Sequence, residues 1–166
     1  MESVFKKYPG EELALQELNE ITNWLHSLST DKEVFGLIHY DFQLDNLFFE
    51  KDKDQHFNVI DFDDAMYHWY SLDLVTALDD FIQDDTPQSK LLIDSFLTGY
   101  RTKIALENDI EAQFPQFQRY ANLYKYARLL KSLDYGEIND TPPWFDELKV
   151  KLVRVADKLK NNFQKS

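Results

Sequence analysis

The sequence contains no cysteine among its 166 residues. Disulfide bonds, thiolate metal sites and cysteine nucleophiles are therefore excluded, and the composition is compatible with a reducing compartment. The sequence also lacks an apolar signal-peptide core near its first residues and any apolar run long enough to span a membrane. We therefore expect a cytoplasmic protein with no membrane partner.

Basic residues are scarce relative to acidic ones. The chain has 18 Lys and Arg against 30 Asp and Glu, which gives a net charge of −12. The imbalance lies in residues 1–100, which hold 21 acidic and 6 basic residues, whereas residues 101–166 hold 9 and 12. Such a charge repels nucleic acid, so we expect no nucleic-acid partner. It suits a metal ion or a cationic small molecule better, with most of the acids serving as ordinary solubilising charge.

The apolar content is high enough for a folded core. Apolar residues make up 43% of the chain and aromatic residues 15%, and the length suits a single domain spanning residues 1–166. Apolar residues recur at helical spacing in five segments. The predicted helices cover residues 11–28, a segment starting at Ser71, residues 88–107, residues 115–133 and a segment after Pro142-Pro143. Ser71 and Thr141 are the predicted N-caps, and Gly136 is expected to close the fourth helix.

The stretch from Leu37 to Asp64 has a different pattern. Two short apolar runs, at residues 47–49 and 57–62, flank the polar sequence KDKDQ. This pattern predicts a β-hairpin with a charged connection. The predicted fold is therefore mainly α with a small β-hairpin. His39, Asp41, Asn46 and Asp61 stand where these strands begin or end, so that their side chains can converge.

These residue types suit phosphoryl transfer. The reaction needs an acidic residue beside the acceptor hydroxyl and oxygen ligands for the Mg²⁺ that bridges the nucleotide phosphates. An Asp and an Asn five positions apart can supply a base and one ligand, and a second Asp beyond the hairpin can supply the other. Oxygen ligands without cysteine or paired histidines suit Mg²⁺ and argue against structural zinc.

The sequences HYDFQLDN and VIDFDD, followed by Asp73-Leu74, resemble the catalytic and metal-binding loops of the protein-kinase-like fold. The finer pattern is similar to the aminoglycoside phosphotransferase and choline kinase family, whose members have H-G-D-x-x-x-x-N, then I-D-F-x-D, then an aspartate-leucine pair. The resemblance is clearest over Leu37–Val75. The helices beyond fit the helical C-terminal lobe of that family.

The resemblance implies a role for each matching residue. Asp41 would be the catalytic base, and Asn46 and Asp61 would be the Mg²⁺ ligands. His39 would support the loop by hydrogen bonding, and Asp73 would anchor its backbone. ATP would be the phosphate donor and a small-molecule hydroxyl the acceptor, with a cationic acceptor favoured by the acidic charge.

The sequence departs from the family in two places. Tyr40 replaces the usual glycine and adds bulk beside the expected base. Only 38 residues precede His39, and they are expected to form one helix, so neither a β-rich N-terminal lobe nor a glycine-rich phosphate loop fits there. We therefore expect the C-terminal lobe with the N-terminal lobe absent, and the nucleotide-binding residues stay unassigned. Apolar surface where an N-terminal lobe would pack could drive self-association.

Several other acidic and aromatic residues could also contact a ligand. Asp79-Asp80 and Asp84-Asp85 could line a cationic pocket, although a solvated helix end is the simpler interpretation. Trp69, Tyr70 and Trp144 could surround a quaternary amine, although ordinary packing is favoured. Asp45 and Asp64 are expected at turns or rims. Asp63 could approach the metal, although shaping its loop is the favoured role. The main alternative function is a non-catalytic binding module; a metal-dependent phosphohydrolase would not account for the H-x-D-x-x-x-x-N spacing.

Overall fold

The chain divides into two compact units, one continuous and one made of two separate segments. A computed structural model describes residues 1–50, 56–84, 86–104, 110–134 and 141–163. The central unit comprises residues 29–118, and the terminal unit combines residues 1–28 with residues 119–166. The long helix α5 (Phe114–Leu133) begins in the central unit and continues in the terminal one.

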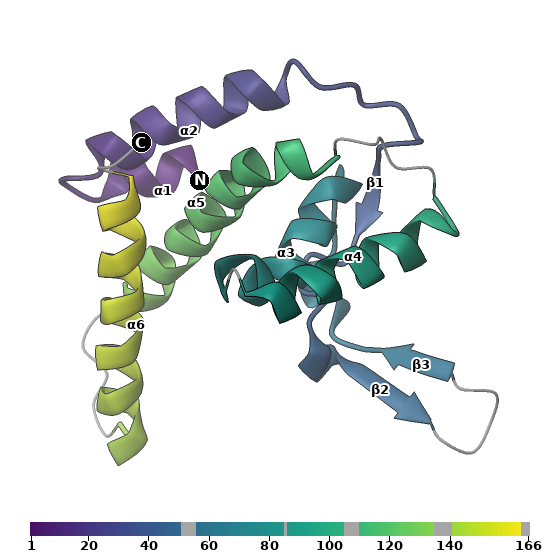
Figure 1. Cartoon of the computed structure of the whole chain (residues 1–166). Coiled ribbons are helices and arrows are strands. Elements are labelled where there is room, and N and C mark those ends of the chain that lie inside the picture. Colours follow the sequence, from purple (N-terminus) through teal and green to yellow (C-terminus); the bar gives the residue numbers. More distant parts are fainter. Residues whose placement is uncertain (51–55, 85, 105–109, 135–140, 164–166) are drawn as a thin grey trace. The chain divides into compact units, whose positions relative to one another are not determined.

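Two small antiparallel sheets organise the central unit (Figure 1). Strands β2 (Leu47–Glu50) and β3 (His56–Val59) form a hairpin in which Leu47 faces Val59, so the predicted hairpin is confirmed. Strands β1 (Phe35–Ile38) and β4 (Met66–Trp69) pair with Phe35 opposite Trp69. This second pair was not predicted. It brings the two chain segments that flank the hairpin together at their base.

Helices α3 (Tyr70–Asp84) and α4 (Pro87–Arg101) pack on each other in the central unit. Strand β4 passes directly into α3, and Ser71 is buried inside that helix, so its prediction as an N-cap is wrong. Thr86 caps α4 by accepting a hydrogen bond from the Ser89 N–H at 3.1 Å. Buried apolar residues of this unit include Ile38, Leu72, Leu74, Val75, Leu78, Leu97, Ile110, Phe114 and Phe117.

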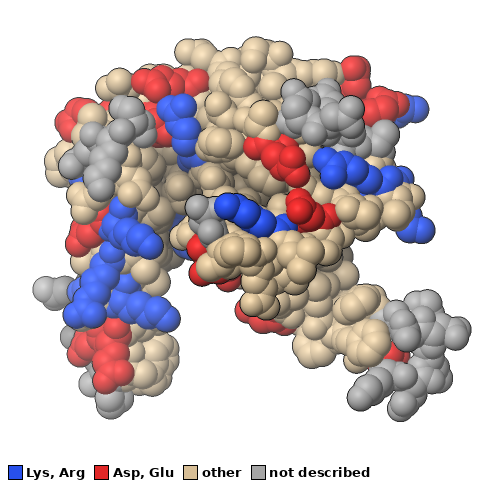
Figure 2. Space-filling model, in the orientation of Figure 1, with Lys and Arg blue, Asp and Glu red and all other residues tan. Residues whose placement is uncertain are grey.

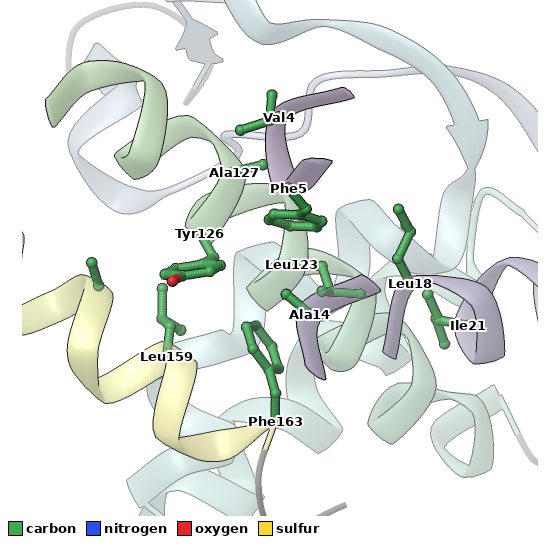
Figure 3. Close-up of a cluster of buried hydrophobic side chains, with 11 residues drawn as sticks. Val4, Phe5, Ala14, Leu18, Ile21, Leu123, Tyr126, Ala127, Leu159 and Phe163 are labelled. Carbon is green, nitrogen blue, oxygen red and sulfur yellow. The ribbon is translucent and has the colours of Figure 1, made fainter. Parts of the chain in front are cut away.

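The terminal unit is helical in its described residues. It contains α1 (Glu2–Lys7), α2 (Glu12–Leu25), most of α5 and α6 (Pro143–Asn162). Figure 3 shows its core, where the ring of Tyr126 lies 5.9 Å from that of Phe5 and 5.5 Å from that of Phe163. The buried Glu11 accepts hydrogen bonds from Tyr126 Oη at 2.8 Å and Lys160 Nζ at 2.7 Å. The Lys160 ammonium group offsets the cost of burying this carboxylate.

Several helix ends differ from the predictions. The first predicted helix ends at Leu25 rather than residue 28, and α1 precedes it unpredicted. Pro142 rather than Thr141 is the N-cap of α6. Helix α4 ends at Arg101, whereas the prediction extended to residue 107; Gly136 lies outside the described residues. The mainly α fold with a small β-hairpin is confirmed. No described helix is both long and apolar enough to cross a membrane.

Candidate functional site

The loop between β1 and β2 is anchored to helix α3 by one carboxylate. Asp73, in the first turn of α3, accepts the main-chain N–H of His39 at 3.0 Å and that of Tyr40 at 2.6 Å. Burial raises the pKa of Asp73 above its usual value, and these two hydrogen bonds act in the opposite direction because they favour the carboxylate. Asp73 thus fixes the backbone just before Asp41.

Asp41 and Asn46 are joined across the same loop. The Asn46 Nδ2 group donates to the Asp41 main-chain oxygen at 2.8 Å and to its Oδ2 at 3.0 Å. The Gln43 N–H also donates to the Asp41 main-chain oxygen, at 2.9 Å. Asn46 is buried and Asp41 is half-buried. Because Nδ2 makes both bonds to Asp41, the side-chain oxygen of Asn46 is the atom that can ligate a cation.

His39 connects this loop to the exit of the hairpin. Its Nε2 donates to the Ile60 main-chain oxygen at 2.9 Å, and its ring lies 4.4 Å from the ring of Phe62 and 6.0 Å from that of Phe42. The ring is buried. These contacts hold the segments on either side of the hairpin against each other.

Asp61 follows the last strand of the hairpin. The Ile60 N–H donates to the Asn46 main-chain oxygen at 3.1 Å, which extends the β2–β3 pairing by one step. Asn46 and Asp61 therefore stand at the same end of the hairpin, away from its connection. Asp61 has φ 64° and ψ 62°, and its exposed side chain makes no cap hydrogen bond to the short 3₁₀ turn Phe62–Asp64 that follows. The left-handed backbone turns the chain sharply at this residue.

The side chains of Asn46 and Asp61 are two groups in this loop region that could hold a divalent cation. Both offer oxygen, and Mg²⁺ commonly takes one or two protein ligands together with substrate phosphates and water. Among the residues that the structure describes, no group of three His, Asp or Glu side chains could hold a metal. The donor set therefore suits a metal that arrives with a nucleotide better than a closed protein site.

Three of the other candidate residues, Trp69, Tyr70 and Asp84, make hydrogen bonds within the fold. Trp69 Nε1 donates to the Ser29 main-chain oxygen at 2.6 Å, and Tyr70 Oη donates to that of Lys32 at 3.1 Å. Asp84 accepts hydrogen bonds from Thr86 and Ser89 at the start of α4. Trp144 is exposed and belongs to the terminal unit; Asp85 lies outside the described residues. Asp63 and Asp64 lie in the 3₁₀ turn after Asp61.

Asp79 and Asp80 line a cavity beside the loop between β1 and β2. It has a volume of about 260 Å³, and its walls also include Asp45 and the polar side chains of Gln43 and Thr76. The sequence predicts a possible ligand contact for Asp79 and Asp80 but not for Gln43 or Thr76. Neighbouring residues in the sequence do not indicate that this loop and α3 line the same cavity. Three carboxylates on one cavity create a negative potential that favours a cationic ligand.

The hairpin itself exposes aromatic side chains. Phe48 and Phe49 on β2 and Phe57 on β3 are each about half exposed or more, at 53%, 49% and 66%. Figure 2 shows the hairpin at lower right as a largely uncharged surface outside the residues drawn in grey. Exposed aromatic groups in such number on one hairpin are typical of a surface that another segment covers.

Comparison with known proteins gives a family and two structural relatives. The family model described as "Phosphotransferase enzyme family" matches residues 5–108, which is more than half of the chain. An amicoumacin kinase, hAmiN, solved with AMP-PNP, Ca²⁺ and Ami, is 23% identical with a TM-score of 0.69; the match covers 95% of this chain and 47% of that one. A microcompartment-associated aminopropanol kinase is 26% identical with a TM-score of 0.61; the match covers 92% of this chain and 43% of that kinase chain. No curated protein sequence matches.

The chain thus spans less than half the length of these two kinase chains. Its helical fold corresponds to a C-terminal lobe of the kind expected from the sequence. The resemblance to this family, first inferred from residues 37–75, is confirmed.

Proposed function

Because this chain belongs to the phosphotransferase enzyme family, we propose that it is the catalytic lobe of a cytoplasmic, ATP-dependent kinase acting on a small-molecule hydroxyl. The observation that carries the proposal is the loop in which Asp73 holds the backbone before Asp41 and Asn46 holds Asp41 itself. Residues 1–166, with their two compact units, would together make up the catalytic domain of that enzyme. The nucleotide-binding site would be completed by a further lobe.

Asp41 is the proposed catalytic base. In the reaction, the acceptor oxygen bonds to the γ-phosphorus of ATP, the bond to the β–γ bridging oxygen breaks, and the hydroxyl proton passes to the Asp41 carboxylate. The Asn46 Nδ2 bond at 3.0 Å orients Oδ2 of that carboxylate. Asn46 Oδ1 and the Asp61 carboxylate would hold Mg²⁺, which when bound neutralises charge on the phosphates.

The acceptor is proposed to be cationic. The cavity of about 260 Å³ that carries Asp45, Asp79 and Asp80 lies beside the loop of Asp41. Replacing Asp79 and Asp80 with Asn should raise KM for cationic acceptors and leave KM for ATP unchanged. Comparing acceptor alcohols that carry no, one or two amino groups would test this directly.

The base assignment is tested in the complete enzyme that contains this lobe. Asp41→Asn should lower kcat by about 10²–10⁴-fold, the usual contribution of a general base, with little change in melting temperature. Asp94→Asn, on exposed α4 surface, is the matched control. Turnover retained in the Asp41 variant would rule out this residue as the base.

A non-catalytic binding module is the second candidate, and the exposed aromatic side chains of Phe48, Phe49 and Phe57 on the hairpin favour it. A metal titration separates the two functions. If Asn46 and Asp61 form a ligand pair, Mn²⁺ added with ATP should raise the melting temperature of the complete enzyme more than ATP alone, and Asp61→Asn should remove this extra rise. An equal rise in Asp61→Asn, or no extra rise in either protein, would favour the module.

A further inference from the structure

A second cavity lies on the α4 side of the catalytic loop. It has a volume of about 450 Å³, within the range of small-molecule sites. Its walls are mainly apolar: the rings of Phe42, Phe96 and Tyr100 and the side chain of Leu74. The rings of Phe96 and Tyr100 stack at 6.4 Å, which forms a continuous aromatic wall along α4. None of Asp41, Asn46 and Asp61 lines it, so the cavity is distinct from the proposed reacting groups.

One carboxylate faces this apolar space. Asp73 lines the cavity and forms no ion pair with any described residue. Each of its oxygens accepts a single main-chain N–H, which leaves further acceptor positions on both. Burial raises the pKa of Asp73, and the two hydrogen bonds and the charge of His39 oppose this shift without cancelling it. A positively charged group beside Asp73 would therefore be favourable.

The remaining wall leaves room for a ligand body. Ser95 donates its hydroxyl to the Leu91 main-chain oxygen at 2.8 Å, so it is already satisfied within α4. At Gly99, an added Cβ would meet no atom within 4 Å. The cavity is therefore open at Gly99 and offers aromatic surface with one anionic group, Asp73.

We propose that this cavity binds a small aromatic monoamine, with its ring between Phe42 and the Phe96–Tyr100 wall and its ammonium group on Asp73. Aromatic surface recognises both the ring and the cation, and the carboxylate supplies the complementary charge. Because Phe42 adjoins Asp41 and Asp73 holds His39 and Tyr40, an occupant acts on the backbone of the catalytic loop without touching the reacting atoms.

The test compares three probes of one shape in the full chain: tryptamine, its alcohol analogue tryptophol and indole-3-acetate. Tryptamine should bind with a Kd in the millimolar range or below, tryptophol at least fivefold more weakly, and indole-3-acetate not measurably. Amide NMR shifts of His39 and Tyr40 should move with tryptamine, because their N–H groups donate to Asp73. Equal binding of amine and alcohol would overturn the assignment of Asp73 as the recognition group.

A pair of α4 variants tests the location. Gly99→Leu fills the open wall and should weaken tryptamine binding at least tenfold, whereas Thr98→Leu, at an adjacent exposed position, should leave it unchanged. Unchanged binding in Gly99→Leu would overturn the proposal. Asp41→Asn should bind tryptamine normally, since Asp41 does not line the cavity. The binding result is therefore independent of whether the proposed kinase activity is correct.

Discussion

The main-chain N–H of Tyr40 donates to Asp73 Oδ1 across 2.6 Å, and Tyr40 has a left-handed backbone with φ 69°. A bulky residue rarely takes this conformation, which glycine adopts without strain. The family's usual residue here is glycine, so the structure explains that preference by backbone geometry. In this chain the carboxylate of Asp73 holds the strained peptide in place.

Replacing Tyr40 should separate backbone strain from side-chain packing. Tyr40→Gly relieves about 1 kcal/mol of strain and loses the contacts of the ring, so its net effect on the free energy of unfolding should be small. Tyr40→Val places a β-branched residue at the same φ and should be less stable than Tyr40→Gly by at least about 1 kcal/mol. Urea unfolding measures both. Tyr67→Val, at an exposed strand position, is the control and should be near neutral.

Removing the Asp73 carboxylate should loosen the catalytic loop. Asp73→Ala deletes the acceptor for two main-chain N–H groups and should cost about 2–3 kcal/mol of the free energy of unfolding. Amide hydrogen exchange should show lost protection at His39 and Tyr40, while Asp94→Ala leaves both protected. Full protection of these two amides in Asp73→Ala would show that the loop is held by other contacts.

His68 should make stability depend on pH. Burial lowers the pKa of His68 to about 4, with the rings of Trp69 at 5.1 Å and Phe117 at 6.3 Å around it. In the unfolded chain the ring titrates near pH 6.5. Protonation of His68 therefore favours the unfolded chain. The free energy of unfolding keeps its full value above pH 6.5 and falls by at most about 3 kcal/mol as the pH drops from 6.5 through about 4.

The variant His68→Gln should flatten this dependence. Unfolding free energies measured from pH 7 to pH 4 should fall less steeply in His68→Gln than in the unmodified chain. His26→Gln, at an exposed position on the end of α2, should retain the original slope. Identical slopes in all three proteins would assign the pH dependence to other groups.

Gly36 should be sensitive to even one added methyl group. A Cβ at Gly36 would stand 2.3 Å from Tyr70 Oη and 2.9 Å from its Cζ. Gly36→Ala should therefore lower the free energy of unfolding by about 1–3 kcal/mol, because β1 or the Tyr70 ring must move. Adding Tyr70→Leu should recover part of this loss. Gly99→Ala, where the Cβ meets nothing within 4 Å, should instead stabilise α4 by up to about 1 kcal/mol.

The features set by local patterns could be predicted from the sequence. The hairpin follows from two apolar runs around a polar connection, and α5 from a repeat of apolar residues, with its observed start at Phe114 one residue before the expected 115. The cap residues were harder to predict. Ser71 has the chemistry of an N-cap, yet β4 leads straight into α3 and the chain never leaves the regular structure before it.

The features set by distant contacts could not be predicted. Strand β1 pairs with β4 across more than 25 intervening residues, and neither four-residue segment has an alternating pattern of its own. The positive φ of Tyr40 and Asp61 likewise depends on the closed loop rather than on residue type. The cavity beside Phe42 needs the packing of α3 on α4, which periodicity does not describe.

The discontinuous terminal unit has a consequence for synthesis on the ribosome. The central unit is one uninterrupted segment, whereas the core around Phe5 and Ile21 also requires Leu123, Leu159 and Phe163. The apolar faces of α1 and α2 therefore stay uncovered during synthesis until α6 has emerged. Bringing α6 to these helices closes a loop of more than 100 residues, which is slow. We expect nascent chains that stop before residue 143 to bind holdase chaperones through α1 and α2.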